Sequence, residues 1–320
     1  MIPTRAPATG RRRPRTAALV VAGAALCAVA AALLGTDAVG RGTGELRIPG
    51  AGTAVLLRTA LFAALAVHIG ALALGPLVRS VPGRPRTLPP SWAVAASAVG
   101  ALAAAGQIVR LARISGLGLV ETYGTREGGL LLLVANGFAL AACCAASRRP
   151  ALAAAPLALA VGAEALRAHP EAYTPLVGTA LTVVHLTAAS LWAGGLLQVL
   201  RTMRHWRTAP AAARALLGRY ARLAVWPYAA LAVTGTCSAL RRLPAEVVFT
   251  SAYGRTLLAK LALMAVVSVL ALAARRRLAR DGGPEGARRA ALREGAALGA
   301  VVLVSAVLTV VPDPHWIATR

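Results

Sequence analysis

Long apolar stretches recur along the whole chain and restrict its possible folds more than any other feature of the sequence. About nine of them approach the ~20 residues that a helix needs to cross the hydrocarbon core of a bilayer. They lie at 17–35, 53–78, 91–112, 129–147, 150–167, 175–200, 221–241, 255–275 and 291–312. Since a helix satisfies all its backbone polar groups within hydrocarbon, the sequence predicts an all-α, polytopic helical bundle in a membrane, with residues 53–312 as the membrane domain.

Composition favours a membrane protein over a soluble one. Apolar residues make up 58% of the chain and charged residues only 14%, whereas a soluble domain carries about 25% charged residues. A net charge of +24 would suggest a nucleic-acid binder if it were spread over a soluble surface. Most basic residues instead lie between the apolar stretches, so we expect membrane lipid as their partner and no nucleic acid.

The distribution of arginine predicts the orientation of the chain. Basic residues are most frequent in those connecting segments that face the cytoplasm if the N-terminus is inside, which predicts N-in and C-out. Residues 1–16 are then a basic cytoplasmic tail. The stretch 17–35 is expected to be a retained first helix or signal anchor, although its basic flank also resembles a signal peptide. Cleavage would leave eight helices in the same orientation.

One histidine stands out within these stretches. His185 lies well inside the stretch 175–200, at a depth where an ionisable group is costly and therefore indicates a functional site. Trp192 is seven residues further on and shares its helical face, and Gly194 and Gly195 predict close helix packing. Imidazole ligates copper, zinc and haem iron, so His185 is a candidate metal ligand. The alternative is a histidine that is hydrogen-bonded to a neighbouring helix.

Other polar residues are expected mainly in the outer halves of the helices. They are Arg58, Gln107, Arg110, Asn136, Glu164, Arg167, Thr234, Thr236, Cys237 and Lys260. This distribution predicts a polar vestibule that opens to the extracytoplasmic side, although basic residues near helix ends also extend to the headgroups. Only His68, just past the middle of 53–78, lies deeper.

Several classes of protein lack their signatures here. The sequence has no GxxxxGK[ST] nucleotide-binding loop and no HExxH metalloprotease pair. Its four cysteines form no C-x-x-C pair, so neither a disulfide framework nor a zinc site is indicated. We therefore expect no enzyme, and any transport is predicted to be passive or coupled to a gradient or a partner.

Three segments of the second half resemble motifs of one family. These are VVHLTAASLWAGGLL at 183–197, GRYARLAVWPYAALAVTG at 218–235 and TSAYGRTLLAKLAL at 250–263. In this order they resemble the CopD family of bacterial copper resistance and uptake proteins, over a core of about 180–277. The resemblance implies a multi-pass protein of the bacterial cytoplasmic (inner) membrane that moves copper inwards or supports copper tolerance.

The resemblance also identifies candidate residues. Arg219, Tyr253, Gly254 and Lys260 lie at motif positions of the family, and Ser251 stands where the family has threonine. His169, in Ala168-His169-Pro170, takes the place of a Gly-His-Ala element. Some relatives carry a fused extracytoplasmic copper-binding domain, which is not expected in this chain. If copper is delivered by a separate extracytoplasmic copper-binding protein, that partner is a different chain.

Three functions remain open on these observations. In the first, the copper ion enters near His169 and is held by His185 with help from His68 or Cys237. Tyr253 and Lys260 would shape the outer mouth, and Lys260 is expected to pair with Glu164. In the second, His68 and His185 are axial ligands of a haem in a b-type electron-transfer protein. In the third, the protein binds no metal and has an assembly role.

Overall fold

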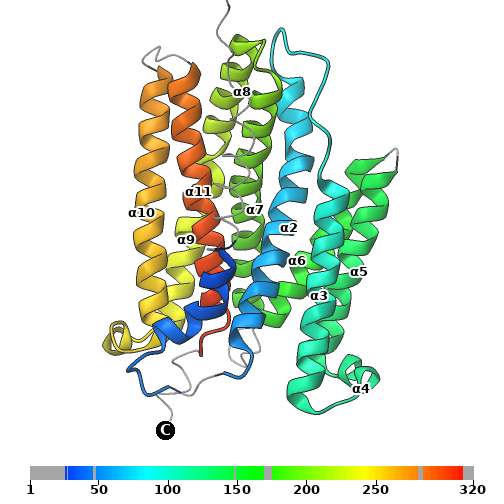
Figure 1. The fold of residues 1–320 in the computed structure, drawn as a ribbon, viewed down its shortest axis with the longest axis vertical. Coiled ribbons are helices and arrows are strands. Elements are labelled where there is room, and N and C mark those ends of the chain that lie inside the picture. Colours follow the sequence, from blue (N-terminus) through cyan, green and yellow to red (C-terminus); the bar gives the residue numbers. More distant parts are fainter. Residues whose placement is uncertain are drawn as a thin grey trace, which may run out of the picture.

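The structure of the chain is a computed structural model that describes residue 26 and residues 28–45, 48–147, 149–168, 175–279 and 284–312. Every regular element within these ranges is helical, and the long helices run side by side as a bundle (Figure 1). The α-helices from residue 51 onwards are α2 (Ala51–Arg79), α3 (Ala93–Ser115), the short α4 (Leu119–Gly124), α5 (Arg126–Ala146), α6 (Ala154–Ala168), α7 (Pro175–His205), α8 (Pro210–Leu223), α9 (Val225–Arg242), α10 (Ala252–Ala279) and α11 (Pro284–Leu308). Short 3-10 helices precede α6 (η1, Pro150–Ala153) and α10 (η2, Ala245–Val247), and a short apolar helix, Ala28–Val39, precedes α2.

Seven helical segments of the described chain are long and apolar enough to cross a membrane. They are α2, α3, α5, η1 with α6, α7, α8 with α9, and α10. The prediction of an all-α membrane protein with several spans is therefore confirmed. The predicted span 291–312 coincides with α11, whose uncharged part runs only from Gly295 to Leu308, and most of 17–35 lies outside the described residues. The total of nine spans and the orientation stay predictions.

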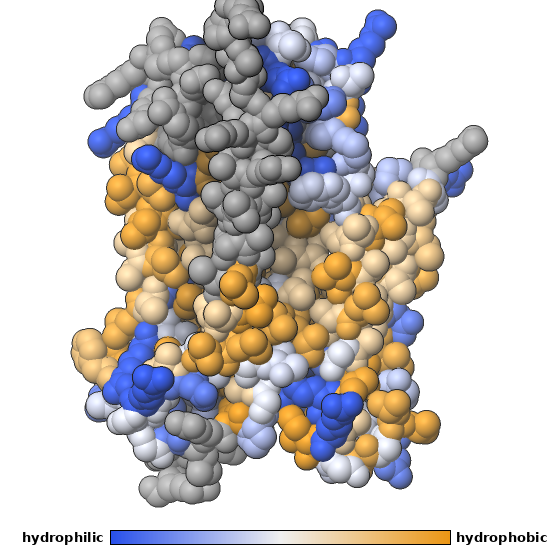
Figure 2. Space-filling model, in the orientation of Figure 1, coloured by the Kyte–Doolittle hydropathy of each residue, from blue (hydrophilic) through white to orange (hydrophobic). Residues whose placement is uncertain are grey.

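Successive candidate spans run in opposite directions, with α8 and α9 together forming one of them. The connections 80–92 and 206–209 lie at one end of the bundle, and the connections 116–125 and 243–251 lie at the other end (Figure 1). On the face shown in Figure 2, an apolar band lies between hydrophilic regions at both ends. This is the surface expected of a bundle whose middle is embedded in hydrocarbon. In the predicted orientation the end with 116–125 and 243–251 is the extracytoplasmic one, and it is called the outer end below.

Helices α2 and α7 pack backbone to backbone at the centre of the bundle. A Cβ atom at Gly194 would collide with the carbonyl group of Ala66, and one at Gly70 would collide with the backbone of Gly194. Gln198 strengthens this contact because its amide donates to the carbonyl oxygen of Val67 over 3.1 Å. The close packing expected from the two glycines at 194–195 is therefore present, and it places α7 between α2 and α9.

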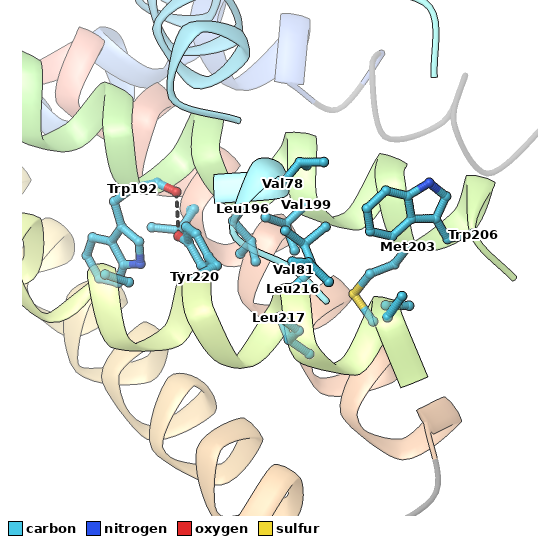
Figure 3. Close-up of a cluster of buried hydrophobic side chains, with 14 of the residues drawn as sticks. Val78, Val81, Trp192, Leu196, Val199, Met203, Trp206, Leu216, Leu217 and Tyr220 are labelled. Carbon is cyan, nitrogen blue, oxygen red and sulfur yellow. Dashed lines mark hydrogen bonds between the residues drawn. The ribbon is translucent and has the colours of Figure 1, made fainter. Parts of the chain in front are cut away.

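The inner half of α7 lies in the largest apolar cluster of the described residues. Trp192 is 2% exposed and its backbone oxygen accepts a hydrogen bond from the Tyr220 hydroxyl over 2.7 Å (Figure 3). Trp206 is also buried and donates from Nε1 to the carbonyl oxygen of Thr87 over 2.9 Å. Trp92 at the same end is 47% exposed, and Trp226, at the junction of α8 and α9, is 75% exposed. Trp192 and Trp206 are therefore packing residues.

Candidate functional site

His185 faces helix α9 from the outer half of α7. Its Nδ1 lies 2.9 Å from the Thr234 hydroxyl. That hydroxyl donates its own proton to the carbonyl oxygen of Ala230 over 2.7 Å, so towards His185 it can only accept. The Nδ1 atom of His185 must then carry the proton, because a hydrogen bond needs one donor. The remaining ring nitrogen, Nε2, keeps its lone pair.

The surroundings of His185 are small side chains and one basic residue. The ring edge points at Gly235, where an added Cβ would lie 3.8 Å from Cε1 of His185. Lys260 of α10 is close enough for its charge to act on the imidazole. Both His185 and Lys260 are partly buried. The prediction that His185 is an intramembrane histidine beside a neighbouring helix fits this geometry, and that helix is α9.

His68 belongs to a different part of the bundle. It is fully buried on α2, and its Nδ1 lies 2.5 Å from the hydroxyl of Ser97 on α3. Its Nε2 is buried and without a partner among the described residues. The His68 and His185 rings are thus bonded to α3 and α9, which lie on different sides of the bundle. The structure does not place them as a facing pair.

The other two candidate ligands are not brought to His185. Cys237 is exposed on α9, three residues beyond Thr234. His169 lies outside the described residues. Within the described ranges, no group of three or more His, Cys, Asp or Glu side chains could hold a metal ion. His185 therefore stands as a single candidate ligand in this part of the chain.

The motif residues of α7 and α8 have packing roles. Gly194 provides the contact with α2 described above. Gly195 lies against the ring of Tyr220, because a Cβ atom added at Gly195 would lie 3.0 Å from Cε2 of that ring. Trp192 meets the Tyr228 ring edge-on, with the ring centroids 5.3 Å apart. Arg219 is partly buried on α8, directly before Tyr220.

The segment 250–263 begins helix α10. The Ser251 hydroxyl accepts a hydrogen bond from the backbone N–H of Gly254 over 3.0 Å, which is an N-terminal cap. A Cβ atom at Gly254 would collide with the carbonyl group of Val248, so the turn requires glycine. Tyr253 is buried in an apolar cluster with residues of α2 and α11. Because α10 starts at Ala252 rather than at 255, Lys260 lies about two turns inside the helix.

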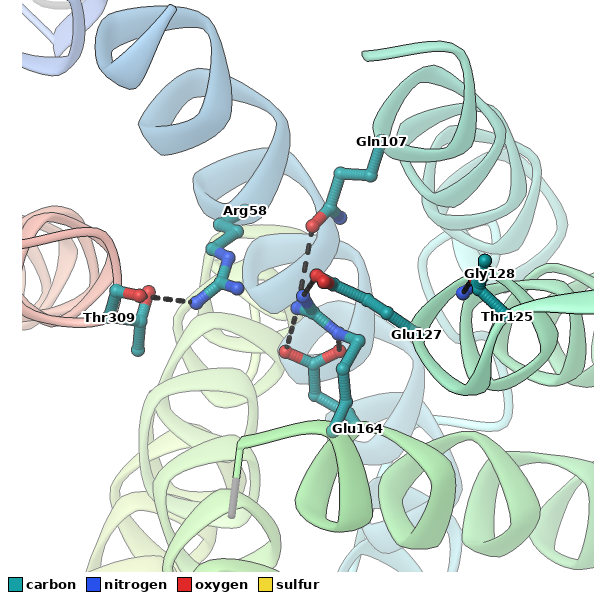
Figure 4. Close-up of polar contacts among 8 residues, drawn as sticks. Arg58, Gln107, Thr125, Glu127, Gly128, Glu164 and Thr309 are labelled. Carbon is teal, nitrogen blue, oxygen red and sulfur yellow. Dashed lines mark hydrogen bonds and ion pairs between the residues drawn. The ribbon is translucent and has the colours of Figure 1, made fainter. Parts of the chain in front are cut away.

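A buried ion-pair network occupies the outer ends of α3, α5 and α6. Arg167 donates to both oxygens of Glu164, over 3.0 Å and 2.6 Å, to Glu127 over 3.2 Å and to Oε1 of Gln107 over 3.4 Å (Figure 4). Glu164 thus pairs with Arg167 one turn away on its own helix, and the expected pairing with Lys260 is wrong. Glu127 was not among the residues expected from the sequence, although its position in the first turn of a helix beside an apolar stretch was an available signal.

The residues expected to line an outer vestibule lie in two separate groups. Arg58 of α2 lies beside the network and donates to the carbonyl oxygen of Thr309 over 2.7 Å (Figure 4). Arg58, Gln107, Glu164 and Arg167 therefore come together as the sequence suggested. His185 lies instead between α7 and α9, with Thr234. Asn136 is exposed on α5, and its amide donates to the carbonyl oxygen of Leu132 on the same helix.

Comparison with known proteins gives one match. Residues 214–311 match the model of the family described as copper resistance protein D (CopD). This stretch contains the motifs at 218–235 and 250–263, and the motif at 183–197 precedes it. No curated protein and no solved structure matches the chain significantly. CopD is a family of copper resistance membrane proteins and not a known enzyme family. Over residues 214–311 the chain is thus similar to the CopD family, and its described part contains several helices long and apolar enough to cross a membrane.

Proposed function

We propose that this protein moves copper across the membrane and that Nε2 of His185 binds the ion during passage. The observation that carries the proposal is the hydrogen bond from Nδ1 to Thr234, whose hydroxyl is already committed as a donor to Ala230. Such a partner fixes the ring and its tautomer, as the outer partners of ligating histidines do in metal sites. Nε2 is then oriented as a lone-pair donor before the ion arrives.

A single fixed histidine suits a transported ion better than a stored one. Cu(I) accepts few ligands and binds both imidazole and thiolate. In the proposal His68, Cys237 and His169 are further stations or transient ligands, and the copper is supplied by a separate extracytoplasmic protein. The positive charge of Lys260 acts on His185 and would weaken retention of a cation there, which favours release.

The test is the metal content of the purified protein after growth with copper, measured by mass spectrometry. We expect copper in the wild type and its loss in His185→Ala. His205→Ala is the matched control, because His205 lies on the same helix but is exposed at its inner end. Thr234→Val keeps the imidazole and removes its partner, so the copper affinity should fall about 10- to 100-fold.

Transport is measured separately, as copper uptake into vesicles that contain the same variants. His185→Ala should abolish uptake while His205→Ala retains it. Copper content and uptake that are unchanged in His185→Ala would contradict the proposal and favour an assembly role. Iron in a fixed ratio to the chain, with a Soret band, would contradict it in favour of haem.

A further inference from the structure

The ion-pair network at the outer end has more positive charge than the described residues neutralise. Arg58, Arg110 and Arg167 carry three positive charges, and Glu127 and Glu164 carry two negative ones. All five charges interact: those of Arg167, Glu164, Glu127 and Arg110 act on Arg58, and those of Glu127 and Arg167 act on Arg110. One positive charge is therefore left over in this network, and an unpaired charge that is buried in a protein is costly.

The same place contains hydrogen-bond donors without acceptors. Gln107 is 3% exposed, and its Oε1 is bound by Arg167. Its Nε2 is buried and has no partner among the described residues. Nε of Arg110, one turn further along α3, is also buried and has no hydrogen-bond partner among the described residues. A buried donor without an acceptor costs about 1–3 kcal/mol, so two of them together indicate that something accepts from them.

The side chains converge from separate helices. Figure 4 shows the Arg58 side chain reaching from α2 to Thr309, and the Gln107 side chain extending from α3 towards Glu127 and Glu164. Four of the five N–H groups of Arg167 are bound by Glu164, Glu127 and Gln107. Arg58 donates to the carbonyl oxygen of Thr309 through one of its nitrogens, Nη1, and its other N–H groups remain for a further acceptor. Most of the donors that are still available thus belong to Arg58, Gln107 and Arg110.

We propose that a small monovalent anion binds between Arg58, Gln107 and Arg110 at the outer end of the bundle. It would accept from Nε2 of Gln107 and from the guanidinium groups, and it would neutralise the excess charge. Chloride is the simplest member of this class and needs no particular geometry from its donors. The site is distinct from His185 and does not depend on the proposed copper passage.

The first test measures chloride binding and thermal stability in a neutral detergent. The purified wild-type protein is compared in sodium chloride and in sodium gluconate at equal ionic strength, and binding is measured with radioactive chloride by equilibrium dialysis. We expect saturable binding, and at 100 times Kd an increase of about 100-fold in the folding equilibrium constant. Equal stability in the two salts, together with no measurable chloride binding, would overturn the proposal. This is the result expected if another carboxylate of the chain fills the site.

The decisive variant is Gln107→Glu, which keeps the oxygen that accepts from Arg167 and adds the missing negative charge. It should be more stable than the wild type in gluconate and should no longer respond to chloride. Arg58→Gln should lose chloride binding. Arg113→Gln is the matched control, because Arg113 is exposed on the same helix as Gln107. Its replacement by glutamine changes the net charge by the same amount as Gln107→Glu.

Three results would overturn the assignment. If Arg113→Gln abolished the chloride response as Arg58→Gln does, the effect would be one of total charge and not of a site. If phosphatidylglycerol stabilised the delipidated protein and chloride did not, the ligand would be a lipid headgroup and not a free anion. Retention of the chloride response by Gln107→Glu would equally exclude the proposed position.

Discussion

Arg167 binds two glutamates that differ in burial, and this difference gives a quantitative prediction. The side chains of Arg167 and Glu164 are 4% and 5% exposed, whereas that of Glu127 is 46% exposed. Removing one partner of a buried ion pair costs about 3–5 kcal/mol because the other charge is left buried and unpaired. An exposed pair contributes only about 0–1 kcal/mol.

Glu164→Gln is therefore expected to lower the free energy of unfolding by about 3–5 kcal/mol, and Glu127→Gln by at most about 1 kcal/mol. Both variants keep the size of the side chain and remove one charge. Unfolding is followed by tryptophan fluorescence in mixed micelles with increasing sodium dodecyl sulfate, because Trp192 and Trp206 are buried in the wild type. The free energies are compared at one detergent composition.

A double variant separates lost attraction from the cost of an unpaired charge. Arg167→Met alone should be as destabilising as Glu164→Gln, since it leaves the Glu164 carboxylate without both of its bonds. Combining Arg167→Met with Glu164→Leu removes both charges and should recover most of the loss. Equal effects of Glu127→Gln and Glu164→Gln, or no recovery in the double variant, would refute the reasoning from burial.

Three further predictions concern packing and hydrogen bonds. Gly194→Leu should separate α7 from α2 at Ala66 and destabilise the protein by more than about 3 kcal/mol. The expected readout is loss of monodisperse protein in size-exclusion chromatography, and a normal elution profile and melting temperature would contradict the backbone contact. Ser251→Ala should cost about 1 kcal/mol by removing the cap on the Gly254 N–H, whereas Ser251→Thr should retain the melting temperature. Tyr220→Phe should cost about 1 kcal/mol through its lost bond to the α7 backbone, and an unchanged thermal midpoint would show that this bond contributes nothing.

The helices themselves could be predicted from the sequence. Hydrocarbon requires backbone groups to be satisfied within each segment, so apolar length alone locates the spans, and eight of the expected stretches coincide with described helices. The close packing at Gly194 and Gly195 could likewise be predicted from residue type, because only small residues let helix backbones approach. The start of α10 was misplaced by three residues, since Ser251 begins the helix through a polar cap and not through an apolar pattern.

The partners of the polar side chains were decided by the tertiary structure alone. Their positions in the sequence place His68 and His185 well inside their helices, but they do not fix the rotation of each helix about its axis. Packing of Gly70 on Gly194 sets that rotation for α2 and α7, and it turns His68 to Ser97 and His185 to Thr234. In the same way Glu164 meets Arg167 and not Lys260, because an i,i+3 neighbour on one helix is adjacent. Sequence therefore determined which segments enter the membrane, and helix packing determined which of their polar groups meet.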